Sequence, residues 1–326
     1  MILGRAAKLR RAGVLGINRR NSAFTLKYNQ RRFYPLVDDK VLCKRRLQEH
    51  GLAVPELIAV IRFNSQVSHL DELLGDHDEF VVKPAHGSGG NGILVITDRR
   101  RDYFVDSDGK PVQKPDLAHY LTNVTGGLYS LGGQPDVAMI ETLVHFDPQF
   151  GGLTYHGVPD IRVIVFRGFP AMAMVRLPTR ASQGKANLHQ GAVGVAIDIA
   201  TGCTTRGVLN NDVVTQHPDT GAELGGLQVP EWQKIMLMAA RCYELTGLGY
   251  LGVDIVLDVR KGPLMLELNA RPGLNIQIAN GEGIVGRLRE IQKFAGDGPG
   301  AERGWRPTPR SDIGKPKPSL PACASM

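Results

Sequence analysis

The chain has 326 residues, 42% of them hydrophobic and 22% charged, with a formal net charge of +7. This length allows one large or two ordinary domains with an ample core, and the composition is that of a globular protein. Residues 1–45 hold twelve Lys and Arg against two Asp, a net +10 that leaves about −3 for the remainder. The basic character therefore belongs to the N-terminal segment.

Neither the apolar runs nor the cysteines indicate a secreted or membrane protein. No run approaches the roughly 18 apolar residues of a membrane span, and the basic N-terminus lacks the apolar stretch of a signal peptide. The four cysteines lie far apart without CxxC spacing, which speaks against zinc and a disulfide framework and fits a reducing compartment. We expect a cytoplasmic protein.

Residues 1–37 are predicted to form a basic arm, with a helix over about residues 3–14. The ordinary interpretation is a solvated arm whose apolar side packs on the main body. Alternatives are a protein partner, an anionic membrane or nucleic-acid surface, or arginines that collect a substrate carboxylate or phosphate. The candidates for the last role are Arg19, Arg20, Arg31 and Arg32.

A helix capped by Asp39 and stopped by Gly51 is expected next, followed by a strand over 79–84 that ends with Lys83 and Pro84. A glycine-rich loop, residues 85–92, leads into a second strand over 93–97. Such a loop can close its backbone N–H groups over phosphate oxygens, and Lys83 can neutralise phosphate charge. The loop lacks P-loop spacing and no helix follows it directly, which disfavours a dinucleotide fold.

The middle of the chain places charged side chains on apolar strands. A helix over 115–128 precedes a strand over 137–143, in which Glu141 needs either the backbone or a ligand amine or hydroxyl as a partner. Strands over 160–166 and 171–177 carry Arg162 and Arg176, cations that are costly there unless they meet an anion. A polar loop over 185–192, strands over 193–199 and 207–214, and a helix from Pro230 to Gly247 follow.

Gly249 to Gly273 is predicted to form a β-hairpin whose turn is centred between Arg260 and Lys261. This register sets Asp254 across from Glu267 on one face, a repulsive pair that calls for a positive charge between them. Met265, Glu267 and Asn269 are expected to share that face. Oxygen ligands from Asp254, Glu267 and Asn269 suit Mg²⁺, although a solvated outer face is the alternative. A helix over 282–294 and a disordered tail over 296–326 complete the chain.

The motifs FVVKP, DIRV, KANLHQGA, GVDI and LELNARPG, in this order, resemble the ATP-grasp superfamily. The resemblance is closest to alpha-L-glutamate ligase-like proteins, related to ribosomal-protein glutamate ligases, and covers about residues 38–285. It implies an α/β (α+β) fold of two subdomains, each a mostly antiparallel sheet with helices, with the nucleotide held between them. We expect a basic arm at 1–37, subdomain one at 38–140, subdomain two at 141–295 and the tail at 296–326. Such ligases usually carry a folded domain before the Asp39-Lys40 helix, where this chain has the basic arm.

The resemblance also implies the site. Catalytic roles fall on Lys83, Arg162 and Arg176, and the ligands of two Mg²⁺ (or Mn²⁺) ions would be Asp254, Glu267 and Asn269. ATP would be bound by Lys40, Lys83, the loop residues His86, Gly87, Ser88, Gly89, Gly90, Asn91 and Gly92, the adenine hinge Glu141, Thr142, Leu143 and Val144, and Asp160, Lys185 and Asn187.

The implied activity is that of an ATP-dependent carboxylate–amine ligase working through an acyl phosphate, which could add glutamate or another amino acid to a peptide or small molecule. Its partners would be ATP, a carboxylate substrate and an amine acceptor, and we expect a homo-oligomer. Two alternatives remain open: a nucleotide-binding scaffold or sensor without turnover, and a kinase of the same fold that phosphorylates a hydroxyl.

Overall fold

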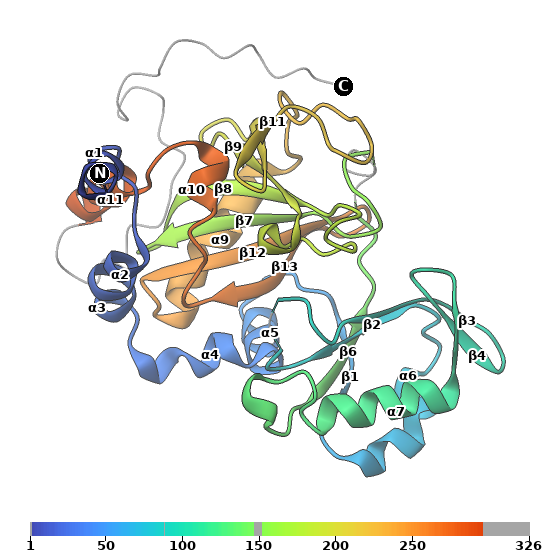
Figure 1. Cartoon of the computed structure of the whole chain (residues 1–326). Helices are drawn as coiled ribbons and strands as arrows, with labels where there is room; N and C mark the ends of the chain where they lie inside the picture. Colours follow the sequence, from blue (N-terminus) through green and yellow to red (C-terminus); the bar gives the residue numbers. More distant parts are fainter. Residues whose placement is uncertain (1, 88, 147–151, 296–326) are drawn as a thin grey trace. The chain divides into compact units, whose positions relative to one another are not determined.

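The computed structural model describes residues 2–87, 89–146 and 152–295, and the predicted disordered tail lies outside these residues. The chain divides into two compact units, Asp38–His145 and Met1–Val37 with Phe146–Met326. Each unit is built around one antiparallel sheet with helices (Figure 1). The two mostly antiparallel sheets confirm the predicted fold class.

Six strands form the sheet of the unit at 38–145, in the order β1-β6-β2-β3-β4-β5. Their bounds are β1 (Leu57–Ile61), β2 (Phe80–Pro84), β3 (Leu94–Arg99), β4 (Tyr103–Asp106), β5 (Pro111–Gln113) and β6 (Ala138–Thr142). The helices are α5 (Lys40–Glu49), α6 (Leu70–Leu74) and α7 (Lys114–Thr125), with 3-10 turns η3 (Asn64–His69) and η4 (Leu131–Gly133). The strand of Glu141, expected to open the second subdomain, instead lies inside this sheet because β6 pairs with both β1 and β2.

The two faces of this sheet are covered differently. Phe80, Ile96 and Phe104 pack with Leu117 and Leu121 of α7 in one buried cluster. On the other side, α5 begins at the predicted cap, where the Asp39 carboxylate accepts hydrogen bonds from the backbone N–H groups of Val41 and Leu42. The cap fixes the start of α5 and thereby the placement of its buried face.

Seven strands form the sheet of the other unit, in the order β11-β10-β9-β8-β7-β12-β13. Their bounds are β7 (Asp160–Phe166), β8 (Phe169–Leu177), β9 (Val193–Ile197), β10 (Thr204–Leu209), β11 (Asp212–Val214), β12 (Tyr250–Asp258) and β13 (Gly262–Asn269). The helices of the second half of the chain are α9 (Trp232–Thr246), α10 (Ile276–Asn280) and α11 (Val285–Ala295), with the 3-10 turn η5 (Leu188–Gln190). The single strand predicted over 207–214 is two strands, because Asn210 and Asn211 adopt the positive φ angles of a tight hairpin turn.

The hairpin β12–β13 has the predicted pairing of Asp254 with Glu267. A β-bulge after Asp254 shifts the register, so the strands reach the turn with Asp258 opposite Gly262. The same bulge pairs Met265 with Ile255, which puts Met265 on the face opposite to Glu267, contrary to the prediction. The turn is thus centred on Arg260 and not between Arg260 and Lys261. The extra residue that the bulge inserts in β13 nevertheless keeps Asp254 paired with Glu267.

Residues 1–37 are an integral part of this unit, not a separate arm. They form α1 (Ile2–Arg11), α2 (Ile17–Arg19), the π-helical turn η1 (Arg20–Thr25), α3 (Leu26–Tyr28), η2 (Arg31–Phe33) and α4 (Pro35–Asp38). Leu15 and Phe24 are buried in one core with Phe166, Tyr250 and residues of α10 and α11. Enough apolar side chains alternate with the basic ones for the segment to fold onto the sheet, as the ordinary interpretation held.

Asn29 ties this segment to both strands of the hairpin. Its amide Nδ2 donates to the Tyr250 oxygen (2.6 Å) and the Ala270 oxygen (2.9 Å), and its Oδ1 accepts from the Tyr250 N–H (2.8 Å). Arg20 Nη1 donates to the Pro272 oxygen at 2.9 Å. The N-terminal segment thus holds the start of β12 and the residues that follow β13.

Asn29→Ala is therefore expected to destabilise this unit. The change leaves buried backbone groups of Tyr250 and Ala270 without partners, each lost bond costing about 1–3 kcal/mol. Thermal unfolding followed by circular dichroism measures the effect, with the exposed Asn18→Ala as the control. An unchanged melting temperature would show that the tie is dispensable.

Among the helices of residues 2–295 that the structure describes, none has the length and apolar character needed to cross a bilayer.

Candidate functional site

Alternation along four strands gathers charged side chains on one face of the seven-stranded sheet. Asp160 and Arg162 of β7, Arg176 of β8, and Asp254 and Glu267 of the hairpin occupy neighbouring register positions, and we call these five residues the charged row. The pairs are Asp160 with Arg176, Arg162 with Asp254, and Asp254 with Glu267. Further along the same strands, this face carries Ile164, Phe166 and Tyr250, which the N-terminal segment and α11 cover.

Two arginines hold the acids of the charged row. Arg162 donates to Asp254 through Nε and, at 2.5 Å, through Nη2. Arg176 donates to both oxygens of Asp160 at 2.5 Å and to Asp254 Oδ2 at 3.0 Å. The predicted positive charge beside Asp254 is therefore supplied by arginine side chains in this structure. The predicted anions for Arg162 and Arg176 are Asp254 and Asp160.

Burial and these arginines shift the pKa values of the two aspartates in opposite directions. Burial raises the pKa of the Asp160 carboxyl to about 6, and Arg176 only partly opposes it. Burial also raises the pKa of Asp254, but Arg162 and Arg176 together outweigh it and leave that pKa below its ordinary value. Asp254 is thus a carboxylate at neutral pH, as metal ligation requires.

Asp254, Glu267 and Asn269 fit a Mg²⁺ or Mn²⁺ ion by the chemistry of their donors. They bring two carboxylates and an amide oxygen to adjacent positions of one hairpin, a set that these cations prefer. Asn269 Nδ2 lies 3.3 Å from Asp254 Oδ2. The described residues contain no cluster of three or more His, Cys, Asp or Glu that could hold a metal, so the third ligand here would be Asn269.

Glu141 is the centre of a buried ionic cluster in the unit at 38–145. Its two carboxylate oxygens each accept from a lysine, Lys83 of β2 and Lys44 of α5. Lys44 also donates to the Pro55 oxygen at 2.9 Å and is 3% exposed, whereas the Lys83 side chain is 19% exposed. The structure therefore gives Glu141 a pair of lysines as partners.

Burial and the ion pairs shift the pKa values of Glu141 and Lys44 in this lysine–glutamate cluster. Burial raises the pKa of Glu141, but Lys83 and Lys44 outweigh it and hold the pKa below the usual value. Burial lowers the pKa of Lys44, and Glu141 only partly restores it. Both lysines neutralise Glu141, and Lys44 is the more deeply buried of the two.

Lys44→Met is expected to destabilise this unit. The change removes the Pro55 hydrogen bond and leaves Glu141 with one lysine, and breaking a buried ionic contact typically costs about 3–5 kcal/mol. Urea unfolding measures the loss against the exposed Lys110→Met, which should change little. Equal stability of the two variants would contradict the role given to Lys44.

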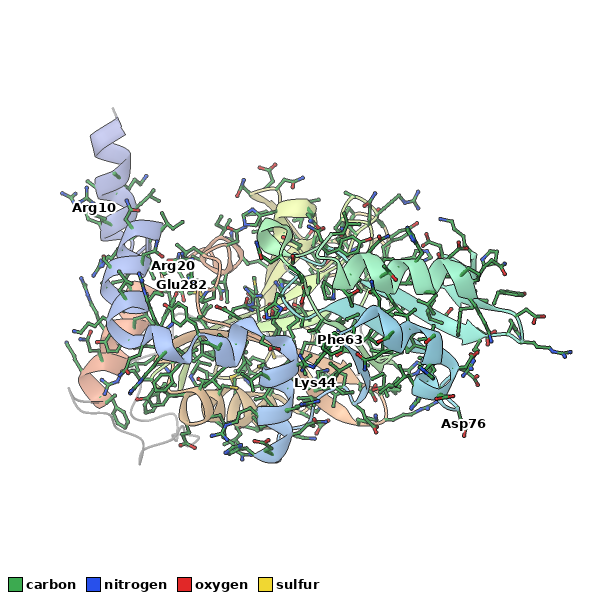
Figure 2. The ribbon with its side chains drawn as sticks, turned by 90° about the horizontal axis from the view of Figure 1, so that it is seen from below. Arg10, Arg20, Lys44, Phe63, Asp76 and Glu282 are labelled. Carbon is green, nitrogen blue, oxygen red and sulfur yellow. The ribbon has the colours of Figure 1, made fainter. Side chains whose placement is uncertain are left out.

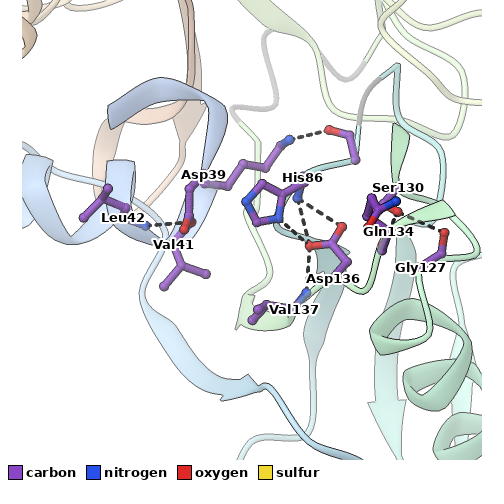
Figure 3. Close-up of polar contacts among 11 residues, drawn as sticks. Asp39, Val41, Leu42, His86, Gly127, Ser130, Gln134, Asp136 and Val137 are labelled. Atoms are coloured by element: carbon purple, nitrogen blue, oxygen red, sulfur yellow. Dashed lines mark hydrogen bonds and ion pairs between the residues drawn. The ribbon is translucent and has the colours of Figure 1, made fainter. Parts of the chain in front are cut away.

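Near the start of the glycine-rich loop, a histidine is held by a buried aspartate (Figure 3). His86 Nδ1 lies 2.7 Å from Asp136 Oδ1, and Asp136 also accepts from the N–H groups of His86 and Val137. Lys40 Nζ donates to the Gly87 oxygen. Gly92 has a φ of +71°, and a Cβ there would meet the Tyr129 ring at 2.5 Å, so this corner of the loop requires glycine.

The structure places the remaining predicted nucleotide residues as follows. The Thr142 N–H donates to the Glu56 oxygen at 2.9 Å, so that hinge amide is already engaged. Asn187 Oδ1 accepts from the His189 N–H and caps η5. Gly89, Gly90, Asn91, Leu143, Val144 and Lys185 lie on loops of their respective units, and Ser88 lies outside the described residues.

Sequence reasoning missed Lys44 and Asp136. Lys44 lies three residues after Val41 and three before Leu47, both buried, so it falls on the apolar face of α5. A lysine on an apolar helical face signals a buried acid elsewhere, and that signal was present. Asp136 follows a proline in a loop and has no periodic pattern to distinguish it.

Together, a lysine that ends a strand before a glycine-rich loop in one antiparallel unit, and an acidic hairpin with two arginines in the other, define an ATP-grasp protein. The chain belongs to the sugar-transfer associated ATP-grasp family, whose model matches residues 19–293.

Several known proteins are similar to parts of this chain. A protein of Aeromonas salmonicida (strain A449) described as "Probable alpha-L-glutamate ligase" is 29% identical over 133 residues, 40% of this chain and 33% of that protein. The ATP-grasp ligase PsnB, solved with a minimal precursor, is 16% identical with a TM-score of 0.44, covering 81% of this chain and 62% of PsnB. D-alanine–D-alanine ligase of Bacillus anthracis with ATP gives the same identity and TM-score, covering 81% and 70%. The chain thus spans a third of the curated relative and less than two thirds of PsnB.

Proposed function

We propose that the protein is an ATP-dependent carboxylate–amine ligase that forms an amide through an acyl phosphate. The observation that carries the proposal is the charged row, in which Arg162 and Arg176 lie beside Asp254 and Glu267 on one sheet face. Fixed cations of this kind stabilise a transferring phosphoryl group and the acyl phosphate that follows it.

Each unit contributes a defined set of residues to this reaction. Lys83 leaves Glu141 to neutralise the ATP phosphates, and the loop at 87–92 presents backbone N–H groups to them. Asp254, Glu267 and Asn269 would hold Mg²⁺ or Mn²⁺, which when bound offsets phosphate charge. Arg162 and Arg176 would place positive charge beside the transferring phosphoryl group and the acyl phosphate, with Arg176 held in position by both oxygens of Asp160.

The relatives direct the choice of substrates. The name of the Aeromonas salmonicida protein points to L-glutamate, as the amine or as the acid. The description of the family as sugar-transfer associated adds uronic acids and amino sugars, which supply a carboxylate or an amine. Amino acids, short peptides and these sugars form one panel of candidate acids and amines.

ADP release with MgATP across this panel, with mass spectrometry of the products, tests the proposal. An active pair should give an amide, ADP and phosphate, and with the acid alone hydroxylamine should trap a hydroxamate. A phosphoester product would show that the protein is a kinase and not a ligase. ATP binding without ADP release from any pair would favour the sensor. The intact set of proposed metal ligands, Asp254, Glu267 and Asn269, favours a ligase over a sensor, because a protein without turnover could lose one of these acids at little cost.

A further inference from the structure

A basic face distinguishes the N-terminal segment from the rest of its unit. Residues 1–37 contain nine Lys or Arg and no Asp or Glu. Seven of the basic side chains are exposed: Lys8, Arg10, Arg11, Arg19, Lys27, Arg31 and Arg32. Among the described residues, none of these seven has an ion pair with an acid.

Large aliphatic side chains are exposed among these charges. Leu9 is 54% exposed, Ile17 60% and Leu26 60%; Leu9 and Leu26 are adjacent in the chain to exposed basic residues, and Ile17 lies two positions before Arg19. Phe294, near the end of α11, is 61% exposed and follows the exposed Lys293. Cations interleaved with exposed aliphatic groups are the composition of surfaces that bind at a lipid interface.

The core holds this face in place. Leu15 and Phe24 are buried, Asn29 bonds the hairpin, and the Gly13 oxygen accepts from the Val285 N–H at the start of α11. Figure 2 shows α1, which carries Arg10, extending away from the neighbouring helices. A segment anchored in this way presents its charges on folded structure and loses little conformational freedom on binding.

We propose that the basic face binds the anionic surface of a lipid bilayer, with Leu9, Ile17 and Leu26 entering the headgroup region. A nucleic-acid site would be expected to offer stacking aromatic rings, but the exposed apolar residues of the segment are aliphatic. A second copy would bring the same positive charge to the contact. The residues at 296–326 carry five Lys or Arg against three Asp or Glu and provide no acidic complement.

Vesicle sedimentation with the full chain tests this assignment. The protein should sediment with vesicles of equimolar phosphatidylcholine and phosphatidylglycerol, weakly with phosphatidylcholine alone, and less as salt rises. Changing Lys8, Arg10 and Arg11 together to Glu should lower the apparent partition coefficient about a hundredfold, since each basic residue at such a surface contributes a few-fold. The matched control changes Arg45, Arg62 and Arg101, exposed in the other unit, to Glu and should bind as the unaltered chain does.

A second variant separates charge from insertion. Leu9→Ser, Ile17→Ser and Leu26→Ser together should weaken binding to anionic vesicles while leaving its salt dependence in place. Equal binding of the charge-reversed and control variants would overturn the assignment. So would an absence of binding to anionic vesicles, or tighter binding to a single-stranded RNA oligonucleotide than to the vesicles. Circular dichroism of each variant confirms that it is folded.

Discussion

Glu267→Gln is expected to abolish coupled turnover while the fold remains intact. The amide keeps the size of the side chain but removes one of the two carboxylates of the proposed metal site. A metal ion contributes several kcal/mol of charge stabilisation to phosphoryl transfer, so turnover should fall about 1000-fold or more. ADP release measured over a range of Mg²⁺ concentrations gives both the rate and the apparent affinity for the metal.

The control for this change is Glu244→Gln, an exposed position on α9. Both variants should melt at nearly the temperature of the unaltered protein, because Glu267 is only half-buried and Asp254 keeps its two arginines. Metal-dependent turnover in Glu267→Gln equal to that of Glu244→Gln would refute the metal assignment. A folded variant with no turnover and a weakened response to Mg²⁺ would support it.

The sequence was sufficient for the fold class and for the pairing of Asp254 with Glu267. Alternating apolar residues indicated strands such as β7 and β12, and the carboxylate pair followed from counting across the turn. The bulge that preserves this pair was not predictable, because no glycine or proline marks it. Met265 was consequently placed on the wrong face.

The partners of the buried charges could not be read from the sequence in the same way. Lys44 and Glu141 are separated by 97 positions, and Arg162 and Asp254 by 92. Local patterns show that each side chain needs a partner, but only the strand order decides which charges become neighbours. The roles of these residues toward ATP and metal remain predictions.

Lys83→Ala is the second change with a large expected effect. In the proposed reaction Lys83 neutralises the ATP phosphates, and a preorganised charge of this kind is commonly worth about 100-fold to 1000-fold in rate. Because the lysine would contact ATP both in the ground state and in the transition state, the KM for ATP should rise while kcat falls. Steady-state ADP release with varied ATP separates the two constants.

Arg162→Lys is expected to affect kcat and the KM for ATP differently from Lys83→Ala. In the proposal, Arg162 acts only when phosphate leaves ATP. A lysine at this position retains a charge near Asp254 but loses the bidentate geometry. Arg162→Lys should therefore lower kcat far more than it alters the KM for ATP. Lys83→Ala should damage both. Equal effects of the two variants on the KM for ATP would show that Arg162 binds the nucleotide as well, and normal kcat in Arg162→Lys would remove that arginine from the reaction.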